Sequence, residues 1–556
     1  MKIVIIGSVA SGTSVAAKAR RNTEEAEITV YDQGKDISYS VCGIPYQIGG
    51  EVATIEELTP RDSVWFKKRY NVDIYTEHKV THVNANEKTL LVENKVTGES
   101  KKDTYDVLVF ATGATPIIPV PFDQKDYQNT FVVRNIQDDR DITTFIASKQ
   151  PKKALIIGGG FIGLEMTEQL ENLGIEVTVV QRGKHIMPQM DPDMAFRVES
   201  YLREKEIRLI LDDTVHAIVE TEKTITGVTT TKGIEIETDM VILATGVRPN
   251  TALAEQIGVN IGETGAIAVN HQMQTNIPDV YAVGDVAESY SLLTNTPMYR
   301  PLGTTANKMG RIAGDVITGG NLEHRGILGT GIFRIFDRHV GYTGMTEKDA
   351  AKAGYEIEVL FNIKPDHAEY MGGKELTIKA LADKKTGRIL GAQAIGQGGV
   401  DKRIDVIATA ITFKAKAEDL FHLDLAYAPP FATTKDPVLY TGMALDNALK
   451  SNPLMTPADL VNRQRDDEAL QIIDTRSKKD FEKAHVKGAI HIPLAELRER
   501  SNELDKSPTT IVYCNKGVTG NAAQNVLLNI GFKKVYNLSG GNKNYQSYIR
   551  MIGLKK

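Results

Sequence analysis

Short apolar runs and glycine turns organise the first half of the chain. An apolar run at residues 2–6 is followed by a glycine turn at 7–12, a helical stretch, and a second apolar run that ends at Tyr31. Runs of four or five apolar residues around such a turn predict a β-α-β unit. The same order recurs at residues 154–180. The duplication predicts two nucleotide-binding domains, each with a doubly wound parallel sheet.

The second half of the chain follows different patterns. After residue 326, strand-like alternation and then helical periodicity from Val400 predict an α+β domain. A polar stretch at 450–457 is typical of a linker, and the remaining residues are enough for a separate α/β domain. The domains that we predict are 1–150 together with 250–325, then 151–249, 326–449 and 455–556.

Composition excludes several classes of protein. The formal charge is −5, and Lys and Arg are spread along the whole chain, so no basic stripe for nucleic acid is present. No apolar run approaches the ~20 residues that span a bilayer, and Met1 opens directly into a strand without a basic leader. We therefore expect a cytoplasmic protein. Two cysteines are too few for a disulfide scaffold.

The glycine turns predict the cofactor chemistry. The second turn reads Gly158-x-Gly160-x-x-Gly163 between a strand and a helix, which is the pattern that receives a dinucleotide pyrophosphate. The first turn has Val9 at the middle position, but Asp32 follows about 20 residues on, where a carboxylate can bind a ribose.

The nicotinamide preference rests on the residues that end the corresponding strand of the second unit. Gln181 and Arg182 stand there, without a carboxylate to repel a 2′-phosphate. NADPH is therefore plausible beside NADH, and a solvated arginine is the alternative interpretation of Arg182.

The segment Thr275 to Asp285 resembles the second FAD signature of two-dinucleotide-binding flavoproteins. Together with both glycine turns and both Ala-Thr-Gly strand ends, it identifies residues 1 to about 320 as similar to a flavin reductase, and the segment after 326 as similar to the dimerisation domain of that family. The FAD-binding residues that the resemblance implies are Gly7, Val9, Ala10, Gly12, Asp32, Val80, Ala111, Thr112, Gly113, Arg134, Gly284 and Asp285. Those implied for NAD(P)H are Gly158, Gly160, Phe161, Ile162, Gly163, Gln181, Arg182 and Gly246.

Cys42 lies in a stretch, residues 38–46, that resembles the single-cysteine branch of the same family. No Cys-x-x-x-x-Cys pair exists, so an internal redox disulfide is excluded, and Cys42 must find its sulfur partner on a substrate. A thiolate is needed to attack sulfur, and we expect the flavin and local backbone donors to lower the pKa of Cys42. Two chemistries use such a cysteine: a mixed disulfide with coenzyme A, or the sulfenic acid of NADH peroxidases and oxidases.

Two features favour coenzyme A. Those peroxidases and oxidases carry a histidine in the first loop, where this chain has Ala10, and the segments 400–405 and 426–436 resemble coenzyme A-disulfide reductases. That resemblance implies a homodimer in which Tyr427 and Tyr370 approach the cysteine from the partner subunit.

The first helix offers a binding face for the phosphates of coenzyme A. Ser14, Lys18 and Arg21 are spaced by four and three residues, which places them on one side of the helix. A solvated basic face has the same spacing. The residues that we assign to coenzyme A, with the resemblance in view, are Ser14, Lys18, Arg21, Ser38, Arg61, Asn307 and Lys435.

The last hundred residues resemble a rhodanese domain, with Asp474-Thr-Arg476, His485 to Pro493, and Cys514 directly after a strand. A cysteine on such a glycine-containing loop can lie within a ring of backbone N–H groups that stabilise a thiolate or persulfide. The loop lacks the arginine that many rhodaneses carry and has Val518 and Thr519 instead. Its sulfur donor is therefore open.

The sequence thus predicts an NAD(P)H- and FAD-dependent reductase of coenzyme A disulfide or persulfide, with sulfane sulfur carried on Cys514. No metal site is expected. The alternatives are an NADH oxidase or peroxidase with a sulfenate at Cys42, and a redox sensor or sulfur carrier without small-molecule turnover.

Overall fold

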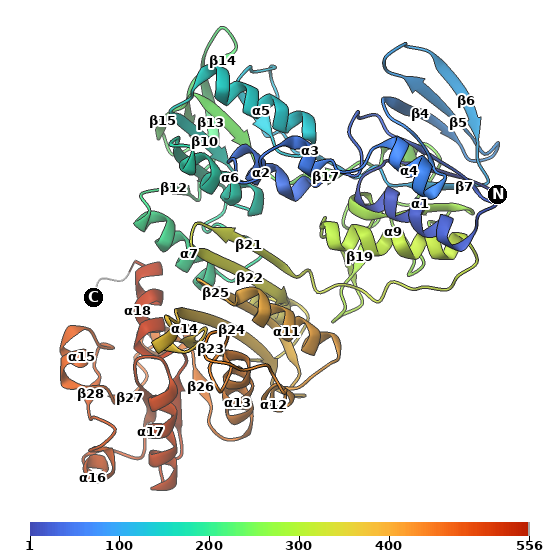
Figure 1. Ribbon diagram of the computed structural model, residues 1–556. Helices are drawn as coiled ribbons and strands as arrows, with labels where there is room; N and C mark the ends of the chain where they lie inside the picture. The colour runs from blue at the N-terminus through green and yellow to red at the C-terminus, as the bar shows by residue number, and fades with distance from the viewer. Residues whose placement is uncertain (554–556) are drawn as a thin grey trace. The chain divides into compact units, whose positions relative to one another are not determined.

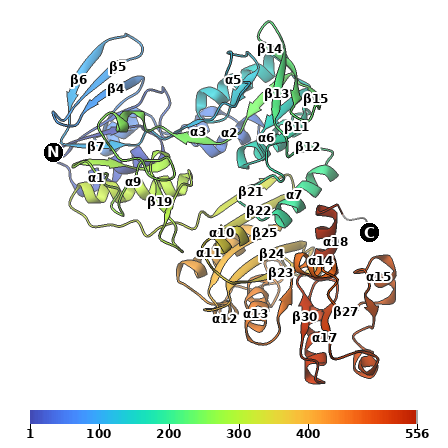
Figure 2. The ribbon, with the colours of Figure 1, turned by 180° about the vertical axis from the view of Figure 1, so that it is seen from behind.

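The computed structural model describes residues 1–553 and divides into two compact units (Figures 1 and 2). The first unit contains Met1–Ile186 and Lys205–Ile327. The second contains Met187–Glu204 and the chain from Leu328 onward. Residues 187–204, which we expected in the second nucleotide domain, group with the second unit.

The first sheet of the first unit is parallel, in the order β18-β7-β1-β2-β3. Its parallel strands and the intervening helix form the β-α-β unit that the sequence predicts. Ile3 of the central strand pairs with Ile28 on one side and Val107 on the other. The strands are β1 (Lys2–Ile6), β2 (Glu27–Tyr31), β3 (Asp73–Tyr75), β7 (Val107–Phe110) and β18 (Val280–Ala282).

The second parallel sheet repeats this plan in the order β12-β11-β10-β16-β9. Its outer strand β9 lies before residue 151, where we expected the second nucleotide domain to begin, and pairs with β16. The strands are β9 (Thr130–Val132), β10 (Lys153–Ile157), β11 (Glu176–Gln181), β12 (Arg208–Leu211) and β16 (Met240–Leu243).

Helices and small antiparallel sheets complete the first unit. The helices are α1 (Ala10–Asn22), α2 (Ile44–Ile48), α3 (Ile55–Leu58), α4 (Ser63–Tyr70), α5 (Ile136–Lys149), α6 (Phe161–Asn172), α8 (Ala252–Glu255) and α9 (Gly303–Ile317), with 3-10 turns η1 (Val41–Gly43) and η2 (Gly284–Val286). The added strands are β4 (His78–Asn84), β5 (Thr89–Asn94), β6 (Ser100–Thr104), β8 (Ala114–Pro116), β13 (Val215–Thr221), β14 (Thr224–Thr230), β15 (Glu235–Glu237), β17 (Val247–Pro249), β19 (Ser289–Tyr290) and β20 (Pro297–Met298).

The second unit begins with an antiparallel sheet in the order β21-β22-β25-β24-β23, so that β23 is an edge strand. Its strands are β21 (Gly331–Ile335), β22 (Arg338–Gly344), β23 (Ile357–Pro365), β24 (Glu375–Asp383) and β25 (Ile389–Gly396). The helices that accompany it are α7 (Pro192–Glu204), α10 (Glu347–Lys352), η3 (Glu369–Met371), α11 (Val400–Thr412), α12 (Ala417–Phe421) and α13 (Pro437–Lys450).

The last sheet is parallel, in the order β26-β30-β29-β27-β28, and Cys514 follows its central strand. The strands are β26 (Leu454–Met455), β27 (Leu470–Asp474), β28 (Ile490–His491), β29 (Thr509–Tyr513) and β30 (Val535–Leu538). Its helices are α14 (Pro457–Arg465), α15 (Lys478–Lys483), α16 (Leu497–Arg500), η4 (Ser501–Glu503), α17 (Val518–Asn529) and α18 (Gly541–Met551). No helix within residues 1–553 is both long and apolar enough to cross a bilayer.

Candidate functional site

Both glycine turns have the backbone geometry that a dinucleotide needs. Gly7 and Gly158 each have φ of +111°, and a Cβ on either would lie 2.2 or 2.3 Å from the carbonyl oxygen of Ala111 or Ala244. A side chain at either position would collide with the end of the neighbouring strand. The two turns are thus fixed as glycines by the same contact.

The next glycines bring each helix close to its turn. A Cβ on Gly12 or Gly163 would lie 1.9 or 2.0 Å from the carbonyl oxygen of Gly7 or Gly158, whereas Gly160 has open space around it. Close packing at the helix and open space at the middle of the turn form the cradle that accepts a pyrophosphate. The residues present therefore fit a bound dinucleotide at both turns.

The side chain at the end of the second strand closes each turn. Asp32 accepts hydrogen bonds from the Ser8 backbone N–H at 2.7 Å and from the Gly34 N–H at 2.8 Å. In the second copy, Gln181 accepts one from the Gly159 N–H at 2.9 Å, and Arg182 beside it is exposed.

The second signature lies against the first turn. Gly284 has φ of +79°, and a Cβ there would lie 2.4 Å from the Ser11 hydroxyl. Asp285 accepts a hydrogen bond from the Arg134 guanidinium at 2.8 Å. Arg134 also donates to the carbonyl of Ala114 at 3.1 Å, just after the Ala-Thr-Gly strand end. Predicted FAD residues from three distant segments thus meet around the first sheet.

Cys42 lies in η1, directly before α2, and is exposed. Although the residue is exposed at the surface, the protein atoms around its thiol partly desolvate it, and this raises the pKa of Cys42. The carboxylates of Glu165 and Asp285 raise it further, and Arg134 opposes them. We expected local donors to lower the pKa of Cys42, but the protein's own groups raise it. Burial and the two carboxylates outweigh the arginine. The five-residue α2 is too short to add a strong dipole.

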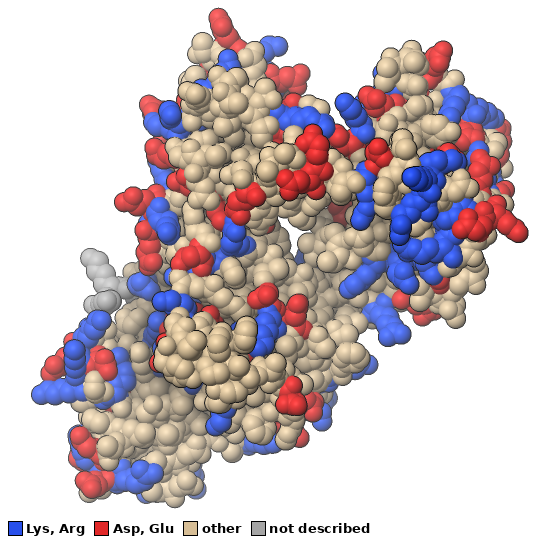
Figure 3. Space-filling view, viewed as in Figure 1, with Lys and Arg blue, Asp and Glu red and all other residues tan. Residues whose placement is uncertain are grey.

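Three of the predicted coenzyme A residues lie on α1, where they contact α4 and α9. Ser14 donates to Asn307 at 2.7 Å, and Arg21 donates to the Tyr70 hydroxyl at 3.1 Å. Lys18 is engaged with Asp315 at 2.9 Å, so its charge is already partnered. Lys and Arg gather over α1 and α4 in Figure 3.

The sequence interpretation did not predict a role for the aromatic residues on this surface. The guanidinium of Arg61 lies 5.2 Å from the Trp65 ring centre, and Arg69 lies 5.7 Å from it. Arg21 lies 5.5 Å from the Tyr70 ring centre. The available signal was the run Ser63–Tyr70, which combines three aromatics with three basic residues beside Arg61. We name the surface of Arg21, Arg61, Trp65, Arg69 and Tyr70 the basic aromatic surface.

The remaining predicted residues have these places. Val9 and Ala10 begin α1, Phe161 and Ile162 begin α6, Val80 is buried in β4, and Ala111 to Gly113 follow β7. Ser38 has a positive φ of 48° and donates its N–H to the Ser8 carbonyl at 3.0 Å. Gly246, with φ of +97°, lies between β16 and β17. Lys435 is in the second unit, just before α13.

In the second unit, Cys514 lies on the expected loop. The thiol is 6% exposed, and its sulfur accepts a hydrogen bond from the Gly517 N–H at 3.1 Å. Gly517 has φ of +101°, and α17 begins at the next residue. Cys514 is thus held between β29 and a helix of 12 residues.

Two exposed loops bring the predicted tyrosines together. The Ala368 N–H donates to the Pro429 carbonyl at 3.2 Å, which joins the segments that carry Tyr370 and Tyr427. Tyr370 is 78% exposed and Tyr427 49%. Neighbouring large apolar side chains on these loops are also exposed, namely Met371 and Phe431.

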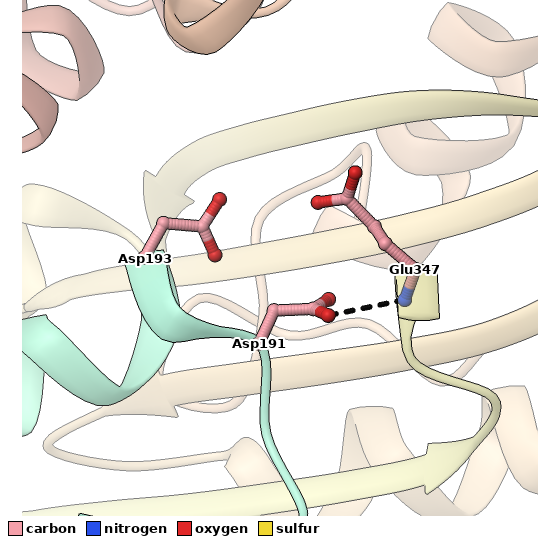
Figure 4. A group of neighbouring side chains, drawn as sticks. All are labelled: Asp191, Asp193 and Glu347. Atoms are coloured by element: carbon pink, nitrogen blue, oxygen red, sulfur yellow. Dashed lines mark hydrogen bonds between the residues drawn. The ribbon is translucent and has the colours of Figure 1, made fainter. Parts of the chain in front are cut away.

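Three carboxylates, Asp191, Asp193 and Glu347, converge in the second unit (Figure 4). The cation among them is Lys379, which is 1% exposed and lies 3.0 Å from Asp191 and 2.8 Å from Asp193. It also pairs with Glu347. Burial disfavours the charge of Lys379, but the three carboxylates outweigh it and raise its pKa. The ammonium group explains the cluster as a structural ion network.

Two Rossmann-type sheets with matched glycine cradles, one signature aspartate and a cysteine beside it define a class of proteins, the oxidoreductases that bind two dinucleotides. The chain belongs to the pyridine nucleotide-disulphide oxidoreductase family, whose model matches residues 1–302, with its dimerisation domain at 332–437. A rhodanese-like domain matches residues 456–548. FAD and NAD(P)H are the cofactors of this family.

Known proteins match either the first four-fifths of the chain or nearly all of it. An NAD(P)H sulfur oxidoreductase (CoA-dependent) of Pyrococcus furiosus is 38% identical over 448 residues, which cover 80% of this chain and 99% of that protein. The crystal structure of reduced Bacillus anthracis CoADR-RHD is 37% identical with a TM-score of 0.95, and covers 99% of this chain and 98% of its own. An NAD-dependent persulfide reductase from A. fulgidus is 35% identical with a TM-score of 0.89, and covers 98% of this chain and 100% of its own.

Proposed function

We propose that the protein is an NAD(P)H-dependent, FAD-containing reductase of coenzyme A disulfide or persulfide, with Cys42 as the redox cysteine and Cys514 as the carrier of sulfane sulfur. The observation that carries the proposal is the place of Cys42. It is the one cysteine of the first unit and lies near Asp285 and Arg134 of the candidate flavin site, while the other cysteine belongs to the second unit. Because its own unit holds no second cysteine, we assign its disulfide partner to a substrate.

We assign one cofactor to each of the two glycine turns. The turn at Gly7, closed by Asp32 and adjoined by Asp285 and Arg134, would hold FAD, and the turn at Gly158 would hold NAD(P)H. A bound flavin supplies two-electron transfer between the nicotinamide and a sulfur at Cys42.

The chain's own groups govern the proton of Cys42. Since Glu165 and Asp285 raise the pKa of Cys42, the thiol keeps its proton until a base removes it. Glu165, which accepts a hydrogen bond from the Tyr46 hydroxyl at 3.1 Å, is the carboxylate that we assign to this proton. Ionised Cys42 then attacks the substrate sulfur, and a coenzyme A thiolate leaves.

The basic aromatic surface supports the substrate class. Coenzyme A presents phosphates and an adenine ring, which match arginines stacked on Trp65 and Tyr70. Ser14 and Asn307 supply neighbouring hydrogen-bonding groups. We assign Lys18 a positioning role, because its charge is paired with Asp315.

We assign a homodimer with Tyr370 and Tyr427 acting in the partner's site. The exposed loops that carry them, with Met371 and Phe431, form an apolar surface of the kind that oligomer interfaces bury. An active, stable monomer would contradict this assignment.

The test is anaerobic oxidation of NADH and NADPH with coenzyme A disulfide and coenzyme A persulfide as competing substrates, while sulfide release is followed. Cys42→Ser should abolish turnover of both substrates with FAD still bound. Turnover retained by that variant would refute the role of Cys42. Stoichiometric peroxide consumption would favour the oxidase alternative, and absence of any small-molecule turnover would favour a redox sensor or sulfur carrier.

A further inference from the structure

The mouth of the Cys514 loop faces the antiparallel sheet of the second unit. The Phe361 N–H, on edge strand β23, donates to the Ser539 hydroxyl at 2.8 Å. Ser539 begins the turn after β30, and a Cβ on the next residue, Gly540, would lie 2.9 Å from the Phe361 side chain. Both ribbon views show this sheet beside the last one (Figures 1 and 2).

Ion pairs continue this contact to the cysteine loop itself. Lys516, two residues after Cys514, lies 3.1 Å from the carboxylate of Glu375, and Lys543 lies 2.6 Å from the same oxygen. Glu375 begins β24 and pairs across the sheet with Pro365, the residue that follows Lys364. The main chain of Lys364 therefore adjoins the residue that lies opposite Glu375.

Lys364 and Lys435 are cations without an acidic partner in the described part of the chain. Lys364 is half-buried, and its ammonium group lies 3.8 Å from the Tyr440 ring centre, with Lys435 5.9 Å from the same centre. Burial lowers the pKa of Lys364, the charge of Cys514 opposes that effect, and Lys516 and Lys435 add to it. An anion at this place would relieve the repulsion between the ammonium groups of Lys364 and Lys435, whereas Lys516 already pairs with Glu375.

We propose that Lys364 and Lys435 of the dimerisation domain complete the rhodanese site, and that they bind the oxyanion of a sulfur substrate whose negative charge lies next to the reacting sulfur. The two lysines thus provide, from another domain, the positive charge that the cysteine loop lacks at Val518 and Thr519. The inference rests on the proposed role of Cys514 as sulfur carrier.

The transfer step balances without another reactant. With inorganic thiosulfate as the probe, the thiolate of Cys514 attacks the outer sulfur and forms a new S–S bond. The S–S bond of thiosulfate breaks, and sulfite leaves with the electron pair. The lysines hold the three oxygens of the leaving group and neutralise their charge.

The test uses the full-length holoenzyme with Cys42→Ser, so that Cys514 is the remaining thiol. We measure the rates at which Cys514 is alkylated by iodoacetate, an anion, and by iodoacetamide, which is neutral. The ratio of the two rates cancels the thiolate fraction and the general access to the loop. Lys364→Met should lower this ratio about ten-fold, the loss expected when one charge-assisted contact is removed.

Lys364→Arg should keep the ratio within about two-fold of the parent, because the charge is retained. The matched control is Lys352→Met on α10, an exposed lysine of the same domain, which should leave the ratio unchanged. Sulfite release in a single turnover with thiosulfate should slow in parallel with the ratio.

An iodoacetate ratio in Lys364→Met within two-fold of the parent, with Cys514 still reactive, would overturn the lysine site alone. Sulfite release that persists in Cys514→Ser would instead refute the role of Cys514. Reduction of coenzyme A disulfide by Lys364→Met with Cys42 present verifies that the variant is folded.

Discussion

Asp32 and Gln181 hold equivalent positions, each accepting a hydrogen bond from the second residue of its own glycine turn. The distances are 2.7 Å to the Ser8 nitrogen and 2.9 Å to the Gly159 nitrogen. The two side chains differ by one charge. A carboxylate would repel a 2′-phosphate near the second turn, whereas the neutral amide does not.

The first prediction concerns Arg182, which follows Gln181 and is exposed. Arg182→Ala should lower kcat/KM for NADPH by about ten- to a hundred-fold, the range for loss of a charged hydrogen bond, and change that for NADH by less than about three-fold. Steady-state kinetics with both nucleotides measure this. Arg208→Ala at the opposite end of the sheet is the control. Equal losses for both nucleotides would mean that Arg182 does not contact the 2′-phosphate.

The second prediction concerns Glu165 and the thiol of Cys42. Glu165→Gln removes a charge that raises the pKa of Cys42 and keeps a hydrogen-bond acceptor for Tyr46. In a Cys514→Ser background, the pH midpoint of alkylation by iodoacetamide should fall by about half to one pH unit. Glu176→Gln, at an exposed position of the same domain, should not move it. An unchanged midpoint in Glu165→Gln would remove Glu165 from the control of this thiol.

The third prediction concerns the ion network of Lys379. Lys379→Met leaves Asp191, Asp193 and Glu347 together without their cation, and should destabilise the second unit by about 3–5 kcal/mol at pH 7. Burial already raises the pKa of Asp191 and of Glu347. In the variant these carboxylates bind protons more readily folded than unfolded, so stability should rise as pH falls toward 5.

Thermal melts of wild type, Lys379→Met and the exposed control Lys384→Met at pH 7 and pH 5 test this. A melting temperature of the Lys379→Met variant equal to that of the wild type would show that the network contributes nothing to stability.

The fourth prediction concerns His324, which is 3% exposed and shares a hydrogen bond of 2.6 Å with the Ser289 hydroxyl. Burial lowers the pKa of His324 to about 4, below the ordinary value near 6.5. The unfolded chain therefore binds a proton first, and stability should be lost as pH falls from about 6.5 to about 4, by roughly 2–4 kcal/mol.

His324→Gln, which keeps a neutral hydrogen-bonding side chain, should flatten this pH dependence of the unfolding free energy. Denaturant unfolding at pH 7, 6 and 5 compares the two proteins. Parallel curves would show that His324 does not titrate in this range.

Periodicity and glycine spacing predicted the fold because they are local. The buried runs at β1 and β10, and the turns after them, formed as expected. The placing of β9 and α7 could not be predicted in this way, since β9 joins the second sheet and α7 groups with the second unit through contacts far apart in sequence.

In the candidate site too, features that lie within one segment could be predicted, and features that depend on distant contacts could not. Asp32, Asp285 and Cys514 lie in patterns that a single segment displays, and each has the place that the pattern indicates. The pKa of Cys42 depends on Glu165, more than 120 residues away, and on burial, neither of which spacing reveals. Lys364 was missed for the same reason, because its relation to Cys514 exists only once two domains are folded together.

The hydrogen bond between Phe361 and Ser539 also bears on solubility. Strand β23 is at the edge of its sheet, and its outward backbone groups at Phe361 and Val359 are both bound to the Ser539 hydroxyl. An uncovered edge of this kind can pair with the edge of another molecule and start aggregation. The C-terminal domain therefore acts as a covalently attached cover, and a chain shortened before residue 455 should self-associate into β-rich oligomers unless that edge is blocked by another means.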